Sequence, residues 1–276
     1  MLLDILRIIL FILFLTPIGV SQSTAPKTNP NLDYQERLED IITKLNGDNL
    51  KPRRRMALQL NLVTLYGYNH PTVDSLIKET HRLAVEHNAT FYIARSKHIG
   101  LIRKKTINQI DSTFLQDIEE IKKIRKSFNN HLLDKWIHLD LGIYYTKVGD
   151  FEKAETNFDL AQEIIENHEN VNSGSIYTYK GMLYQRKREY KKALESYNIA
   201  LTQPVVGKKF IYNSLAKLYS EMGDFQNAHT LAQQALNLDI QSGRDADIES
   251  NVILGDLSLS KKDTSEALSY LSLIHI

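Results

Sequence analysis

The chain has 276 residues, with 34 basic and 33 acidic side chains, a formal net charge of +1 and no cysteine. The balanced charge gives no strong electrostatic attraction for nucleic acid or for an acidic surface. The absence of cysteine excludes disulfides, thiolate metal sites and cysteine nucleophiles, and the length favours an extended array over a single compact core.

Residues 1–21 form an apolar N-terminal segment unlike the rest of the chain. Arg7 precedes an uninterrupted apolar run over residues 8–15, which a proline and Gly19 then end. Gly19 and Ser21 are small residues at the positions that signal peptidase reads, so cleavage after Ser21 is predicted. The run is shorter than the about 20 residues that span a bilayer. We expect a signal peptide, or an N-terminal anchor if it stays uncleaved. A buried helix of the domain is the alternative, but the run is not amphipathic.

The next segment changes from polar linker to helical pattern. Residues 22–31 are polar and contain two prolines, which predicts a flexible tether. Apolar residues at helical spacing then predict a helix over about residues 32–45. This helix opens a region of degenerate helical hairpins over residues 32–131.

Two hairpins are expected in the remainder of that region. The first covers residues 53–88, and its second helix opens at Pro71, a residue favoured in the first helical turn. The second pairs residues 89–104 with residues 113–128, whose isoleucines fall on one helical face. Neither hairpin shows a clear internal repeat, so their membership of an array is inferred from spacing and order.

Residues 132–241 carry one pattern of small and ring residues three times. In the first register the pattern is Gly142, Tyr145, Gly149, Phe151, Ala154, Phe158 and Ala161. In the second it is Gly181, Tyr184, Arg188 in place of the second glycine, Tyr190, Ala193, Tyr197 and Ala200. In the third it is Ala216, Tyr219, Gly223, Phe225, Ala228, Ala232 and Ala235. Self-similarity at a period of about 20–50 residues indicates a stacked array.

The residue types at these steps predict two helices joined by a tight turn. Leu141, Tyr145 and Val148 fall on one face of a first helix. Gly142 lies in mid-helix, where glycine costs about 0.5–1 kcal/mol, a cost that close approach of a neighbouring helix would offset. Gly149 supplies a left-handed C-cap, and the aspartate after it caps the second helix.

These residues and steps resemble those of the tetratricopeptide repeat (TPR) family. The registers are 39, 35 and 39 residues apart, measured from residue 142 to 181, 216 and 255, against about 34 in the family. Longer periods are common among its bacterial members, so the resemblance favours an exported or signalling type. It implies an all-α fold, an α-solenoid of stacked antiparallel helix hairpins in the form of a TPR superhelix. A chance amphipathic bundle is the alternative.

A further unit begins after the three clear ones. Residues 242–270 are expected to form an incomplete TPR unit, with Gly255 and Ala267 at the repeat steps but Ser258 and Thr264 in place of rings. Residues 271–276 resemble the translation of a transposon end used in sequencing libraries. We expect a sequencing scar there, and hence a natural C-terminal part beyond it; the alternative is a native peptide.

No motif indicates catalysis. The chain has no glycine-rich phosphate loop, no nucleophile elbow and no zinc-binding helix motif, so we expect no enzyme, no cofactor and no metal site. His81 and His87 lie on different faces of a helix, and His138 is expected to pack in the core. The basic runs 53–55 and 103–105 are interpreted as residues at helix ends, where cations are favourable.

The resemblance implies a groove lined by the first helices, which holds a peptide or a partner helix. In the first unit its lining residues are Leu139, Ile143, Thr146 and Lys147. The predicted partner-binding residues of the next two units are Thr178, Met182, Gln185, Arg186, Asn213, Lys217 and Ser220. This mixture of apolar, amide and basic groups suits a peptide with some negative character. Asn213 and Lys217 resemble part of the carboxylate clamp that holds chaperone tails, but Thr178 and Met182 do not, so such a receptor is not expected.

Two functions are consistent with these observations. The first is an exported scaffold, periplasmic or secreted or anchored by its N-terminus, that binds a protein or peptide partner outside the cytoplasmic membrane. The alternative is the sensory half of a truncated membrane-bound signalling protein, with a histidine kinase or DNA-binding output beyond residue 270. No nucleic acid is expected to bind the part present, and a membrane contact is expected only through residues 1–21.

Overall fold

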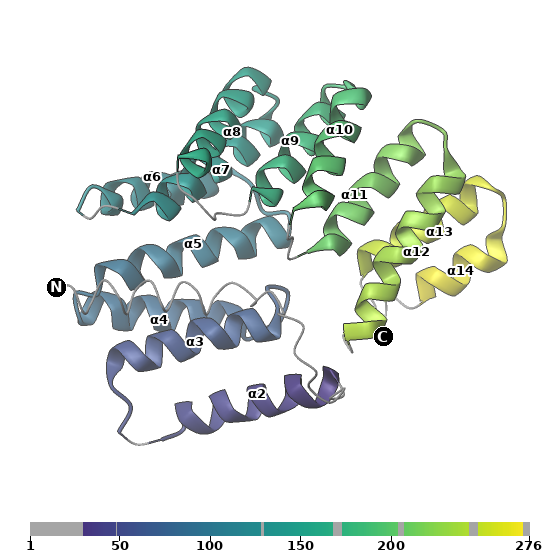
Figure 1. Cartoon of the computed structure of the whole chain (residues 1–276). Helices are drawn as coiled ribbons and strands as arrows, with labels where there is room; N and C mark the ends of the chain where they lie inside the picture. The colour runs from purple at the N-terminus through teal and green to yellow at the C-terminus, as the bar shows by residue number, and fades with distance from the viewer. Residues whose placement is uncertain are drawn as a thin grey trace. The chain divides into compact units, whose positions relative to one another are not determined.

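The computed structural model describes residues 30–47, 49–127, 130–167, 173–203, 207–242 and 248–272. Helices and turns account for these residues, and no strand occurs among them, which confirms the all-α prediction. The chain divides into two compact units, Met1–Gln109 and Ile110–Ile276 (Figure 1). No helix within the described ranges is long and apolar enough to cross a membrane. The predicted signal segment, residues 1–21, lies outside those ranges.

The described residues of the first unit form four helices packed in chain order. They are α2 (Pro30–Leu45), α3 (Pro52–Tyr66), α4 (Val73–Glu86) and α5 (Thr90–Thr106). Two apolar clusters hold α3, α4 and α5 together, one around Met56 and Ala84 and the other around Leu60 and Ile99. The last two residues of the predicted tether, 30 and 31, already belong to α2. The second helix of the predicted hairpin begins at Val73, two residues after Pro71.

The second unit is a series of antiparallel helix pairs (Figure 1). Its helices are α6 (Ser112–Arg125), α7 (His131–Val148), α8 (Phe151–Glu166), α9 (Gly174–Arg186), α10 (Tyr190–Thr202), α11 (Lys208–Glu221), α12 (Phe225–Ser242), α13 (Ile248–Ser260) and α14 (Thr264–Ser272). The pairs are α7 with α8, α9 with α10, α11 with α12 and α13 with α14. Each second helix also packs on the first helix of the next pair. The three predicted repeats and the fourth, incomplete one are therefore present as hairpins.

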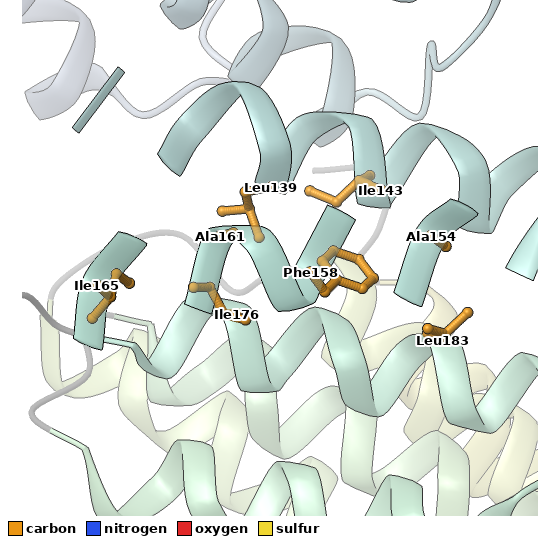
Figure 2. Packing of buried hydrophobic residues seen from close by; sticks show 8 residues of the cluster. All are labelled: Leu139, Ile143, Ala154, Phe158, Ala161, Ile165, Ile176 and Leu183. Atoms are coloured by element: carbon orange, nitrogen blue, oxygen red, sulfur yellow. The ribbon is translucent and has the colours of Figure 1, made fainter. Parts of the chain in front are cut away.

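A shared apolar seam joins one hairpin to the next. Figure 2 shows side chains of α8 lying between α7, which carries Ile143, and α9, which carries Leu183. The small residues at the predicted steps, Ala154, Ala193 and Ala228, are all fully buried. No single hairpin encloses its own core, because each cluster takes residues from three consecutive helices or more.

Close approach of a ring explains the mid-helix glycines of the first two repeats, Gly142 and Gly181. A Cβ added at Gly142 would lie 2.4 Å from Cε1 of Phe158, and one added at Gly181 would lie 2.6 Å from Cε1 of Tyr197. Each ring follows its glycine by 16 residues, and both rings are fully buried. In the third hairpin the same step pairs two alanines, Ala216 and Ala232, within one cluster. The predicted packing of a small residue against a ring is thus confirmed in the first two repeats, whereas the third repeat packs two small residues at the same step.

The turns inside the hairpins use the predicted chemistry. Gly149 ends α7 in the left-handed conformation, with φ at 85° and ψ at 9°. The Asp150 carboxylate then accepts the backbone N–H of Lys153 at 3.3 Å and caps α8. At the step of Gly149, Arg188 of the second hairpin adopts φ 59° and Lys262 of the fourth adopts φ 64°, whereas the first and third hairpins have glycine. A non-glycine residue in this region costs roughly 1–2 kcal/mol, so these two turns are less relaxed than the two that carry glycine.

The first helices depart from the prediction at Val148, the last residue of α7. Val148 was predicted to share the face of Leu141 and Tyr145, yet 55% of its surface is exposed. The repeated tyrosines Tyr145, Tyr184 and Tyr219 are half-buried at the edges of the apolar clusters. Within the first unit α5 packs on α4, and within the second unit α6 packs on α7. The hairpin of residues 89–104 with 113–128 stays a prediction.

The two basic runs differ in their electrostatic setting. Arg103, Lys104 and Lys105 lie in the last turn of α5, where the helix dipole favours cations, as predicted. The run 53–55 lies instead in the first turn of α3, where the dipole disfavours cations, so the prediction for this run was wrong. Arg55 offsets part of that cost by donating to the Leu45 carbonyl at 3.1 Å.

The fourth hairpin follows the packing rule of the others. Its α14 extends through Ser272, two residues past the predicted end of the unit at residue 270. A Cβ added at Gly255 would lie 2.8 Å from two side-chain carbons of Leu271, again 16 residues later. Leu271 therefore takes the place that a ring takes in the first two repeats. The other residues of the predicted scar, 273–276, lie outside the described ranges.

Candidate partner-binding site

The first helices of the second unit form a layer of their own. α7 contacts α9, α9 contacts α11, and α11 contacts α13, so four first helices lie next to one another in chain order. The seven predicted partner-binding residues all belong to α9 and α11 of this layer. Their contacts decide which of them a partner can reach.

Thr178 and Met182 support the layer itself. Thr178 is only 3% exposed, and its hydroxyl donates to the Gly174 carbonyl of its own helix at 2.7 Å. Met182 is half-buried and packs against the apolar cluster that α10 and α11 share. Thr178 is therefore too buried to be a main contact for a partner, whereas Met182 keeps part of its apolar surface exposed, and its role in binding stays a prediction.

Gln185 links three helices. Its Oε1 accepts the hydroxyl of Tyr197 on α10 at 3.0 Å, and its Nε2 donates to Glu221 Oε1 on α11 at 2.8 Å. Because the ring of Tyr197 is fully buried, this amide also fixes the end of the ring that packs on Gly181. Gln185 is therefore a connector between repeats that is still partly open to solvent.

Asn213 and Lys217 both bind a carboxylate of the next repeat. Lys217 Nζ lies 2.6 Å from Glu249 Oε1 on α13, and Asn213 Nδ2 lies 3.5 Å from the other oxygen of the same carboxylate. Asn213 is 1% exposed, and its Oδ1 accepts the hydroxyl of Ser250 at 3.1 Å. The structure thus brings these two predicted residues together, but around an internal carboxylate.

Arg186 and Ser220 complete the predicted set at the C-terminal ends of their helices. Arg186 is exposed and Ser220 is half-buried. In the first of the three repeats, Lys147 is the exposed residue among those expected to line the groove. Leu139 and Ile143 belong to the buried seam shown in Figure 2. The reachable part of the predicted site is therefore mainly basic.

Two features of this layer were missed in the sequence. Tyr179 of α9 and Phe210 of α11 have ring centroids 6.0 Å apart with the planes tilted by 52°, so an aromatic pair bridges neighbouring first helices. Phe210 precedes Ala216 by six residues, as Trp136 precedes Gly142, and this shared step was an available signal. Glu249 likewise precedes Gly255 by six residues, so the same spacing would have placed its carboxylate at the position that corresponds to Phe210.

A polar network joins the first and second repeats beside this layer. The Tyr184 hydroxyl donates to Glu155 Oε1 at 2.8 Å, and Lys187 Nζ donates to Glu155 Oε2 at 3.2 Å. Burial acts to raise the pKa of Glu155, but the hydrogen bonds from Tyr184 and Lys187 hold it below its usual value. Burial and the bond to Glu155 raise the pKa of Tyr184. The network keeps the carboxylate charged and the phenol neutral, which suits a structural role.

The described residues offer little for metal or acid–base chemistry. No group of histidine, aspartate and glutamate side chains in the described part of the chain could hold a metal ion. The His138 ring pairs with Asn157 Oδ1 at 3.0 Å and is half-buried, so it is less enclosed than the core position expected for it. His81 pairs with Ser96 Oγ at 3.0 Å within the first unit.

Comparisons with known proteins agree with the repeat pattern. A model of the tetratricopeptide repeat matches residues 211–239, which cover most of α11 and α12. Anaphase-promoting complex subunit 3 of Schizosaccharomyces pombe is 35% identical over 86 residues, which make up 30% of this chain and 12% of that protein. The chain thus spans about an eighth of the length of this relative.

Three solved structures are similar in fold. The APC/C hetero-tetramer Cut9–Hcn1 gives a TM-score of 0.57 at 13% identity, over 99% of this chain and 49% of that one. BtubC (BKLC) from P. vanneervenii gives 0.51 at 17% identity, over 82% and 91%. A tetratricopeptide repeat protein from Parabacteroides merdae gives 0.50 at 11% identity, over 90% and 100%. Residues 211–239 thus match the tetratricopeptide repeat family, and the stacked hairpins with their glycine–ring packing steps continue the same fold on either side of this match in the second unit.

Proposed function

We propose that the chain is a scaffold that binds a partner protein on the layer of first helices in the second unit. The observation that carries the proposal is the unbroken succession of α7, α9, α11 and α13, which leaves the cations of Arg186 and Lys217 exposed. Solenoid repeats commonly bind partners along such an extended surface. This role calls for no catalytic group.

The chemistry of the layer favours an extended partner segment with acidic and apolar side chains. Arg186 and Lys217 supply positive charge, and Met182, Tyr179 and Phe210 supply half-buried apolar surface between them. An extended peptide can place a carboxylate and an aromatic or aliphatic side chain on alternating sites of this kind. We therefore propose a peptide or partner helix of negative character.

The place of action is proposed from the sequence alone. The apolar run and small residues of segment 1–21 are typical of an export signal, so we propose that the scaffold works outside the cytoplasmic membrane. The alternative of a sensory half of a membrane-bound regulator rests on the long repeat period.

A second candidate function is a subunit of a larger protein assembly. The relative at 35% identity over 86 residues is by its name a subunit of the anaphase-promoting complex, and the Cut9–Hcn1 structure is of a hetero-tetramer. In this case the partner is another folded subunit that contacts a broad area of the layer. The two candidates differ in whether a short peptide is enough for binding.

The test is a peptide selection on the full chain followed by charge reversal. Peptides selected from a display library for binding to the wild-type chain are measured by fluorescence anisotropy against Arg186→Glu. The proposal predicts that the selected peptides are acidic and that the variant weakens their binding at least about tenfold, since attraction becomes repulsion.

The matched control is Lys191→Glu, an equal charge reversal at an exposed position of the second helix α10. It is expected to leave the affinity unchanged within about twofold. Selected peptides that bind Arg186→Glu as well as the wild type contradict the proposed surface. A selection that yields no peptide, while a folded partner subunit binds in an Arg186-dependent way, favours the assembly subunit.

A further inference from the structure

One carboxylate of the chain already occupies the donors that the proposed site offers to a partner. Glu249 lies in the first turn of α13, and its two oxygens contact two different side chains of α11. Oε1 lies 2.6 Å from Lys217 Nζ, and Oε2 lies 3.5 Å from Asn213 Nδ2. A cation and an amide N–H directed at one carboxylate are the groups that recognise a carboxylate ligand.

Burial fixes the side chain of Asn213, which contacts the Glu249 carboxylate. Asn213 is 1% exposed and Ser250 is fully buried, and the Ser250 hydroxyl donates to Asn213 Oδ1 at 3.1 Å. Because that bond occupies the amide oxygen, the amide nitrogen is held toward the carboxylate position. The Asn213 donor is therefore in place whether or not Glu249 is there to accept from it.

The Glu249 side chain, in contrast, can leave the contact. The side chain of Glu249 is 37% exposed and that of Lys217 is 49% exposed. Exposed ion pairs contribute little net free energy, because both partners are also well solvated when apart. Glu249 can thus rotate into solvent at small cost, whereas Asn213 cannot follow it.

We infer that Glu249 is an internal ligand of this site and competes with the carboxylate of a partner segment for Lys217 and Asn213. The inference rests on the proposed function and adds its regulation. With Glu249 seated, the seam between α11 and α13 is closed and charge-neutral. An incoming carboxylate replaces Glu249 on the same two donors, so a partner binds there only if its own contacts outweigh the internal one.

The competing explanation is a simple brace between repeats. Glutamate is favourable in the first turn of a helix, and a bond from α13 to α11 would stabilise the stack. A brace and an internal ligand predict opposite effects on partner affinity. Removing a brace leaves carboxylate binding unchanged or weaker, whereas removing a competitor makes it stronger.

The experiment uses the full chain and a defined probe. A short fluorescein-labelled peptide rich in aspartate and glutamate, with a free C-terminal carboxylate, is titrated by anisotropy against the wild type and Glu249→Gln. Glutamine keeps the size of the side chain and removes its charge. The expected result is an affinity about two- to fivefold higher for the variant, the range that an exposed ion pair provides.

Three controls make the result specific. Asp256→Asn changes net charge equally at an exposed position of the same helix, and its affinity should stay close to that of the wild type. Adding Lys217→Met to Glu249→Gln should abolish the gain. A matched probe with asparagine, glutamine and an amidated end should show no gain. Circular dichroism and the urea midpoint establish that each variant is folded.

The outcomes separate this inference from the proposed function. If Glu249→Gln binds the acidic probe no more tightly than the wild type, while Arg186→Glu still weakens binding, the internal-ligand inference is overturned and the proposed surface stands. If an equal gain appears for Asp256→Asn, the effect is one of net charge and the inference fails. If the acidic probe binds none of these proteins, the inference and the acidic partner of the proposed function fail together.

Discussion

Gly142 shows how a missing methyl group sets the distance between two helices. The Phe158 ring fills the space in which its Cβ would stand, 2.4 Å from the nearest ring carbon. The ring is fully buried among α7, α8 and α9, so it has no free volume into which to retreat (Figure 2). The cost of a glycine in mid-helix is in this way offset by tight packing.

We predict that Gly142→Ala lowers the free energy of unfolding by about 1–2 kcal/mol. Overpacking costs about 1–3 kcal/mol, which exceeds the about 0.5–1 kcal/mol that alanine gains in helix propensity. The matched control is Gly100→Ala in α5, where an added Cβ meets nothing within 4 Å and propensity alone should act. Urea unfolding followed by circular dichroism measures both. Equal or opposite shifts for the two variants contradict the packing explanation.

At the scale of elements, polar pairs between helices supplement the apolar seam. Glu155 of α8 accepts hydrogen bonds from Tyr184 and Lys187 of the next hairpin, and Lys187 also contacts Glu189 at 3.0 Å. Lys192 lies 5.3 Å from the centroid of the Tyr184 ring, so this ring is held by charges as well as by packing. Such bonds fix the orientation of neighbouring hairpins at the edge of the core.

We predict that Glu155→Gln weakens the dependence of stability on acid pH. Although burial acts to raise it, the bonds from Tyr184 and Lys187 lower the pKa of Glu155, so its contribution is present above the unfolded pKa. That contribution is lost as the pH falls from the unfolded pKa of Glu155 through its lower folded pKa.

Urea midpoints measured across this interval test the prediction. The variant should lose less stability than the wild type on acidification, starting from a lower value at pH 7. Glu163→Gln, an exposed position of the same helix, is the control and should follow the wild-type curve. Parallel curves for Glu155→Gln and the wild type exclude a role of the network in acid stability.

The elements could be predicted wherever small and ring residues recur. The steps through Gly142 and Gly181 placed the hairpins, because a glycine–ring pair works only between two helices at close range. In residues 89–128 no such steps occur, and helical periodicity alone did not indicate which neighbour each helix would choose. The structure shows α4 as a neighbour of α5 and α7 as a neighbour of α6 within their own units, which the periodicity did not indicate.

The candidate site was less predictable than the fold. The predicted site residues lie on the first helices, between the small and ring residues of the repeat pattern. The sequence does not indicate whether the next helix covers such a residue. Thr178 and Asn213 are covered and Arg186 is not, although all three satisfy the same pattern. Glu249 was missed because it belongs to the fourth unit, whose ring steps are replaced by Ser258 and Thr264.

At the scale of the molecule, stability is distributed over neighbouring hairpins. The described residues of the second unit pack in successive clusters that each join one hairpin to the next, as Tyr197 of α10 packs with Ile211 and Leu215 of α11. Such an array is stabilised by nearest-neighbour interfaces, so damage at one seam should spread to adjacent hairpins. The layer of first helices, and with it the proposed binding surface, depends on this coupling.

Hydrogen exchange of Ala193→Asp tests the shared seam most directly. Ala193 is fully buried where α10 packs on α11. An aspartate carboxylate at this position would be buried without a compensating charge or hydrogen bond. The account predicts that amide protons of α11 exchange at least about tenfold faster, although α11 itself is unchanged. Asn198→Asp, which adds the same charge at an exposed position of α10, should leave them protected. Retained protection in α11 of Ala193→Asp would contradict the claim that consecutive hairpins share one core.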